Sequence, residues 1–226
     1  MKPWQKEQWC IPSVGAEFVY HMEDLLDLYE EPYDPRFPVV NFDELPYQLT
    51  AEVRLPLPAR PGQPERYDYE YHRCGTCNLF LHFEPLRGWR HVEVTDQRTA
   101  LDFAHQMKAL VDAHYPEAVK IRVVLDNLST HREWALYNAF PAEEARRILR
   151  RLEFHHTPKH GSWLNIAEIE LSVLSRQCLD RRLADTPTVH QQVAAWENER
   201  NQANTTVNWR FTTQHARERL QRLYPS

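Results

Sequence analysis

The chain has 226 residues, of which 42% are hydrophobic and 12% aromatic, so it can bury a substantial core and is not intrinsically disordered. Its formal net charge of −5 argues against a protein that coats nucleic acid by bulk charge. No run of about 18 apolar residues could span a membrane, and the start, MKPWQKEQWC, lacks the apolar stretch of a signal peptide. We therefore expect a cytoplasmic protein that does not associate with membranes.

The first predicted element is a helix over residues 16–29. Its inner face is formed by Phe18, Met22, Leu25 and Tyr29, which recur at helical spacing. The prolines of PYDPRFP then end the helical pattern, because proline lacks the amide hydrogen that a helix interior requires.

Three strands are predicted next. VVNFDE (39–44) is a short buried strand that ends at Asp43, and the proline-rich stretch 54–66 is a loop. Residues 67–84 are interpreted as a hairpin that turns at Gly75-Thr76, and HVEVTD (91–96) alternates as a third strand.

Cys74 and Cys77 form a C-x-x-C motif in this region. A zinc site needs a second pair of ligands at suitable spacing, and none follows. We favour the hairpin over metal or redox use, which stays as the alternative.

The second half of the chain alternates helices with strands. Thr99 and Asp102 give a weak capping-box signal for a helix whose inner stripe is Ala100, Ala104, Met107 and Val111. The further predicted elements are a strand, IRVVLD (121–126); helix over 132–151; a strand, LEFHHTP, stopped by Pro158; a long helix over about 162–182; and another helix that begins at Thr186-Pro187. This order predicts one α/β domain, with strands 1–3 antiparallel and strands 4 and 5 reached by helical crossovers.

Three acids stand at the predicted strand ends and helix start: Asp43, Asp126 and Glu168. Sites in open α/β sheets form where strand ends converge. Carboxylates gathered there need a cation, and an oxygen-rich set suits Mg²⁺ or Mn²⁺ better than zinc. Two such ions can activate a nucleophile and stabilise the leaving oxygen in phosphoryl transfer.

The stretches FDELPYQL, VVLDNLSTH and TPKHGSWLNIAEIELSVL together resemble the catalytic domain of mariner-type insertion-sequence transposases, of the DDE superfamily of endonucleases. The resemblance implies a ribonuclease-H-like α/β fold with a mixed five-stranded sheet flanked by helices. It implies that Asp43, Asp126 and Glu168 bind two Mg²⁺ or Mn²⁺ ions for DNA hydrolysis and strand transfer. The expected division is an N-terminal helical segment (1–38), the catalytic domain (39–185) and a C-terminal helical extension (186–226).

Other residues near these acids are candidates for supporting roles. Asn127, His131 and Asn165 match positions that flank the acids in the family, and Lys159 and His160 are expected to meet phosphate at the rim. Simpler readings stay open: Glu44 could replace Asp43 as the ligand, Asp126-Asn127 could form an Asx turn, and His131 could be a structural histidine.

NIAEIE offers two glutamates, and residues two apart on a helix lie about 200° apart around it. Trp163, Leu164, Ala167, Leu171, Leu174 and Cys178 define the predicted buried stripe, widened by Ile166, Ile169 and Val173 on the side of Glu170. Glu168 falls at the opposite margin with Asn165 and Ser172, so it is the predicted ligand, whereas Glu170 would need a partner within an apolar arc.

The resemblance implies transposon-end and target DNA as partners, a homodimer in the active complex, and a bacterial, nucleoid-associated protein. Only 42 residues precede Asp43, so a helix-turn-helix portion could be encoded separately. The alternative is a truncated or domesticated remnant that only binds DNA or a partner. The basic clusters at 146–151, 176–182 and 217–222 are interpreted as solvated helix faces.

Overall fold

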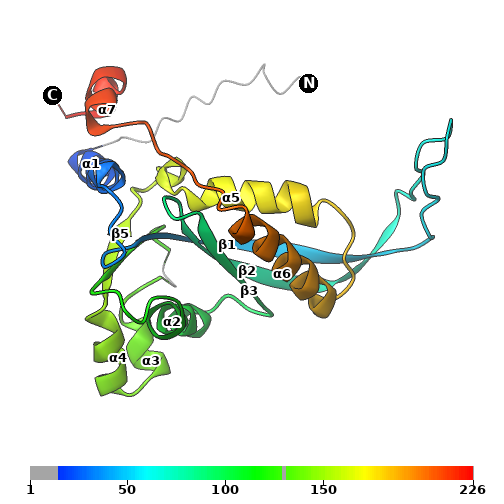
Figure 1. Ribbon diagram of the computed structural model, residues 1–226, viewed down its shortest axis with the longest axis horizontal. Helices are drawn as coiled ribbons and strands as arrows, with labels where there is room; N and C mark the ends of the chain where they lie inside the picture. The colour runs from blue at the N-terminus through cyan, green and yellow to red at the C-terminus, as the bar shows by residue number, and fades with distance from the viewer. Residues whose placement is uncertain (1–14, 129–130, 226) are drawn as a thin grey trace.

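The computed structural model describes residues 15–128 and 131–225. A mixed five-stranded sheet lies at its centre, with helices on both faces (Figure 1), as predicted. The strand order is β3-β2-β1-β4-β5; β1, β2 and β3 pair antiparallel, whereas β1–β4 and β4–β5 are parallel. The strands are β1 (Val39–Glu52), β2 (Tyr71–Glu84), β3 (Trp89–Thr95), β4 (Ile121–Leu125) and β5 (Leu152–His156).

Strand β1 is much longer than predicted, and Asp43 lies within it rather than at its end. Only Val39–Asn41 pair with β4, whereas pairing with β2 continues to Glu52. The strand therefore leaves the parallel part of the sheet after Asn41 and goes on as one side of a long β1–β2 arm (Figure 1), whose tip is the predicted loop.

The predicted hairpin turn at Gly75-Thr76 is wrong, because β2 runs unbroken through both residues. Gly75 has a φ of 112°, a left-handed value that favours glycine, and it lies beside a register shift at Leu49/Thr50. Glycine here accommodates a bulge rather than a turn. Cys74 and Cys77 are both free cysteines on this one strand, the first exposed and the second buried.

One face of the sheet is covered by α2 (Ala100–Ala109), the π-helical turn η2 (Leu110–His114), α3 (Ala135–Ala139) and α4 (Ala142–Leu149). The Thr99–Asp102 capping box forms as predicted. The helix predicted over 132–151 is instead two short helices, because Pro141 at the N-cap of α4 separates them.

The other face is covered by α5 (Ala167–Leu174), which continues as the π-helical turn η4 (Ser175–Leu179), and by α6 (Thr186–Gln202). The long helix predicted over 162–182 is wrong in part. A 3-10 turn, η3 (Ser162–Leu164), comes first, and the extended backbone of Asn165 separates it from α5. Pro187 lies in the first turn of α6, which is capped by the Asp185 side chain.

The N- and C-terminal segments pack together beside β4. Helix α1 (Ala16–Glu30) buries Phe18, Met22 and Leu25 in a cluster with Val124 and with Ala216 of α7 (Thr213–Arg219). A short 3-10 turn, η5 (Gln221–Leu223), follows α7. Within the described ranges, no helix is both long and apolar enough to cross a membrane.

Candidate active site

The parallel register brings Asp43 and Asp126 to the same level of the sheet. Asn41 of β1 pairs with Val124 of β4, and each candidate acid comes two residues later on its own chain segment. Side chains two apart point to the same face of a sheet. Val124 packs toward α1, and the Asn41 side chain accepts a hydrogen bond from the Ile166 amide just before α5. Asp43 and Asp126 therefore share the face on which α5 lies.

The segment before α5 is fastened to β1 by two buried asparagines. Asn165 donates from Nδ2 to the Phe42 carbonyl at 2.9 Å and accepts from the Ala167 amide at 3.1 Å. The Asn41 amide oxygen accepts from the Tyr29 hydroxyl at 2.6 Å, and the same hydroxyl contacts the Leu164 carbonyl at 2.8 Å. These bonds set the start of α5 beside Asp43.

The two glutamates of α5 differ in surroundings. Glu168 is exposed, on the side of the helix that carries Ser172. Glu170 is 1% exposed and pairs with Arg90 at 2.8 Å and with Arg200 at 2.6 Å. The predicted need of Glu170 for a partner in an apolar arc is met by these two arginines. The predicted stripe is wrong for Trp163 and Ile169, which are 42% and 43% exposed.

Asp43 experiences the other acids electrostatically. Burial raises its pKa to about 7, and the negative charges of Asp126, Glu168 and Glu44 add to the rise. The Glu44 amide, which donates to Asp43 at 2.9 Å, opposes the shift only in part. The four carboxylates are thus close enough to repel one another, and a cation among them would lower their free energy.

His131 is buried between two of these acids. Its Nδ1 is 2.6 Å from Asp126 Oδ1, and its Nε2 is 2.6 Å from Glu44 Oε2. Burial opposes the positive charge, but the hydrogen bonds to both carboxylates outweigh it and raise the pKa of His131 to about 9. The ring packs on Phe42 and Phe103, with centroids 5.3 and 5.0 Å away.

Glu44 is the residue whose role the sequence did not reveal. The sequence offers it only as a substitute for Asp43 as a ligand, whereas its side chain is 5% exposed and contacts both His131 and, at 3.4 Å, Arg98. Its position next to Asp43 was the only signal available, since both partners are distant in sequence.

Three other predicted residues, Asn127, Lys159 and His160, form no side-chain hydrogen bond or ion pair with the candidate acids among the described residues. Asn127 is exposed, and the Leu128 amide donates to Asp126 Oδ1 at 3.3 Å, so the Asx-turn reading also holds. Lys159 and His160 are exposed in the turn before η3, where His160 has a φ of 67°. Their expected contact with phosphate stays a prediction.

The three candidate acids have the ligand chemistry that suits a hard divalent cation. Asp43, Asp126 and Glu168 supply only oxygen, and Asp43 is held beside like charges that a cation would neutralise. Among the described residues, no three acid, histidine or cysteine side chains are gathered closely enough to hold an ion as they stand. One carboxylate oxygen of Asp126 contacts His131 Nδ1.

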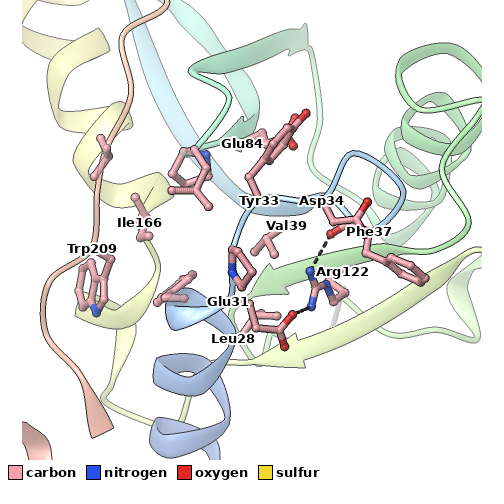
Figure 2. A pocket seen from close by; sticks show the side chains of 15 residues that line it. Leu28, Glu31, Tyr33, Asp34, Phe37, Val39, Glu84, Arg122, Ile166 and Trp209 are labelled. Carbon is pink, nitrogen blue, oxygen red and sulfur yellow. Dashed lines mark hydrogen bonds and ion pairs between the residues drawn. The ribbon is translucent and has the colours of Figure 1, made fainter. Parts of the chain in front are cut away.

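A separate pocket lies near the start of β1 and β4, where Val39 and Arg122 line it (Figure 2). Arg122 pairs there with Glu31 and donates to the Phe37 carbonyl. None of the three candidate acids lines this pocket. The acid cluster and the pocket are thus distinct sites.

Comparisons with known proteins agree with this fold. Residues 38–190 match the family model described as DDE superfamily endonuclease. Among solved structures, the Mos1 mariner paired end complex with Mn aligns with a TM-score of 0.55 and 16% identity, over 84% of this chain and 57% of that one. The mariner Mos1 paired end complex with Mg aligns with a TM-score of 0.58 and 15% identity, over 98% of this chain and 67% of that one.

At such identity the structural likeness shows the fold alone. The chain spans 57% of the length of the Mos1 chain in the complex with Mn. A search of curated proteins gave no match. The family model, however, matches residues 38–190, well over half of the chain, and this range includes the positions of Asp43, Asp126 and Glu168. The chain belongs to the DDE superfamily endonuclease family.

Proposed function

We propose that this chain is the catalytic domain of a metal-dependent DNA transposase, which hydrolyses phosphodiester bonds at insertion-sequence ends and transfers the freed 3′ end to target DNA. The observation that carries the proposal is the placement of Asp43, Asp126 and Glu168 on one face where β1, β4 and α5 meet. Membership of the DDE superfamily endonucleases supports it. Resemblance in fold to Mos1 complexes solved with Mn and with Mg is consistent with two Mg²⁺ or Mn²⁺ ions.

In this proposal Asp43, Asp126 and Glu168 hold the ions. Such a pair of ions, when bound, activates the attacking oxygen and stabilises the leaving oxygen of the phosphodiester. The rest of the chain positions the acids: His131 holds Asp126 and Glu44, and Asn165 holds the start of α5 against β1. Lys159 and His160, exposed at the rim, and Asn127, beside Asp126, are proposed to contact DNA.

The proposed partners follow from the proposed reaction. They are transposon-end DNA, target DNA and a second copy of the chain; the Mos1 structures are described as paired end and strand transfer complexes. We further propose that the protein acts in the bacterial cytoplasm at the nucleoid. We also propose that residues 39–185 form the catalytic domain between 1–38 and 186–226.

The test is cleavage of insertion-sequence-end DNA in Mg²⁺ or Mn²⁺ by the wild type and by Asp126→Asn. The proposal predicts nicking by the wild type that EDTA abolishes and that Asp126→Asn lacks. A wild type that binds DNA without cleaving it would favour the alternative, a remnant that only binds DNA or a partner.

A further inference from the structure

A groove follows the exposed side of α5, beginning beside Glu168. Its lining residues are Trp163, Asn165, Glu168, Ile169, Ser172 and Arg176. A second groove shares Arg176 and leads on to β1, lined by Leu45, Pro46, Tyr47, Ser175, Arg176, Leu179 and Asp180. The candidate acid Glu168 is thus one wall of a longer surface channel.

Two large apolar side chains are exposed in the first groove. Trp163 is 42% exposed and Ile169 is 43% exposed, although both fit the apolar stripe of the sequence. Trp163 is held in place, since it stacks on Trp209 with centroids 6.4 Å apart and meets Phe211 edge-on at 6.0 Å. An indole that is fixed and still open to solvent is a ready platform for stacking a nucleic acid base.

Arg176 is the cation of the channel. It is exposed and forms no ion pair with any residue of the described chain, whereas Arg182 and Arg200 are bound to Glu52 and Glu170. Asp180 lines the second groove but is not paired with it. A guanidinium left free beside a groove suits a backbone phosphate.

The order of these groups follows the helix. Ser172 and Arg176 come four and eight residues after Glu168, so they lie along one side of α5 and η4. At 1.5 Å per residue, Arg176 is roughly 12 Å along the helix from Glu168. Trp163 lies before Glu168 in the same groove.

We infer that this channel binds one DNA strand beside the scissile phosphate, with an unpaired base stacked on Trp163 and a backbone phosphate bound by Arg176. The inference rests on the proposed function, because it takes DNA as the substrate. The strand crosses Glu168, with the base on one side of that acid and the bound phosphate on the other. A phosphate next to Glu168 itself meets like charge and needs a cation there, whereas the one at Arg176 does not.

Binding is measured without cleavage, in EDTA, with a short oligothymidylate that carries one 2-aminopurine. Trp163→Ala is expected to bind about tenfold more weakly and to lose the quenching of 2-aminopurine, because stacking on one base contributes on the order of a factor of ten. Trp163→Phe keeps most of both. Arg176→Gln lowers the slope of log affinity against log salt by about 0.7, and Arg176→Lys restores it.

Matched controls come from the opposite face of the sheet. Trp134 is 62% exposed and Arg150 is exposed, so Trp134→Ala and Arg150→Gln make the same chemical changes away from the channel. They are expected to bind as the wild type does. Circular dichroism and thermal melting establish that every variant is folded.

Equal binding by the channel variants and the controls would overturn the inference, as would a wild type that does not bind the oligonucleotide. A change in molar mass by light scattering for Trp163→Ala, with unchanged DNA binding, would assign the surface to a second copy of the chain instead. Failure of the proposed function looks different: the wild type would bind through the channel yet cleave no DNA in Mn²⁺. If the wild type cleaves DNA and the channel variants bind the oligonucleotide as the wild type does, the inference about the channel is contradicted and the proposed function is supported.

Discussion

His131 and Asp126, which are five positions apart in the sequence, are joined by a hydrogen bond of 2.6 Å between Nδ1 and Oδ1. The other ring nitrogen of His131 is 2.6 Å from Glu44, which follows Asp43 on the neighbouring strand. The imidazole thus connects the end of β4 to β1 at the level of the two aspartates.

Replacing His131 by alanine is expected to destabilise the fold by about 3 kcal/mol. The substitution leaves the buried Glu44 with only its longer contact to Arg98, at 3.4 Å, and breaking a buried ion pair costs about 3–5 kcal/mol. We expect a value at the lower end of this energy range because Asp126, the other partner of His131, is 28% exposed and water can solvate it. Urea unfolding measures the difference. His190→Ala, at an exposed position of α6, is the control, and an equal loss in both variants would contradict the role given to His131.

Glu170→Gln is expected to lower stability by a similar amount, about 3 kcal/mol. Arg90 is fully buried and loses its carboxylate partner, so its charge stays uncompensated in the core. The matched control is Glu199→Gln, since Glu199 is exposed on α6 next to Arg200. Chemical denaturation of both variants decides the matter: a Glu170→Gln protein as stable as the wild type would show that the arginine pairs contribute little.

Acid is expected to destabilise the protein through His82. Burial lowers its pKa to about 3, the charges of His91 and His114 act in the same direction, and the hydrogen bond with Gln106 opposes the shift in part. Between pH 6.5 and about 3 the unfolded chain therefore binds a proton that the folded chain does not. The contribution of the neutral His82 to the free energy of unfolding is fully present above this pH window. Within the window, it falls by up to about 1.4 kcal/mol per pH unit.

The measurement is thermal melting across that pH range for the wild type and His82→Gln. The variant is expected to be less stable at neutral pH, because the buried site is disturbed, and to lose less stability on acidification. His190→Gln should follow the wild-type slope. Parallel pH slopes for His82→Gln and the wild type would show that other groups cause the acid sensitivity.

Much of the fold could be read from the sequence because it depends on local patterns. The alternation in 91–96, the apolar run before Asp126 and the capping box at Thr99 each describe a single element, and each is found where predicted. The sequence order of strands and helices was enough to predict a mixed sheet with parallel crossovers.

The errors arose where pairing between distant segments decides the structure. Glycine is typical of turns, which is why Gly75 was predicted to lie in one, but pairing with β1 places it at a bulge within a strand. The partners of Glu170, namely Arg90 and Arg200, come from β3 and α6, and no local pattern indicates them. Trp163 fits the helical stripe, but the chain is not helical at Asn165, so its side chain is left exposed.

Divalent metal is expected to raise the melting temperature of the wild type. Burial raises the pKa of Asp43 to about 7, the charges of Asp126, Glu168 and Glu44 add to the rise, and a bound ion would relieve that repulsion. Calorimetry with Mn²⁺ and with EDTA measures the shift. The Asp43→Ala, Asp126→Ala, Glu168→Ala triple variant should show little of it; an equal shift there would show that the ion binds elsewhere.

The central claim is that Asp43, Asp126 and Glu168 act together as the catalytic acids of a DNA-cleaving site. Glu168 and Glu170 allow the most direct test, because they are two residues apart on one helix, one exposed near Asp43 and the other buried against arginines. The measurement is DNA cleavage in Mn²⁺ by Glu168→Gln and Glu170→Gln, expressed per folded molecule at a temperature where both are native. The predicted result is loss of cleavage in Glu168→Gln with unchanged stability, and retained cleavage in Glu170→Gln with reduced stability. Near-wild-type cleavage by Glu168→Gln, or its loss only in Glu170→Gln, would contradict the assignment of the site.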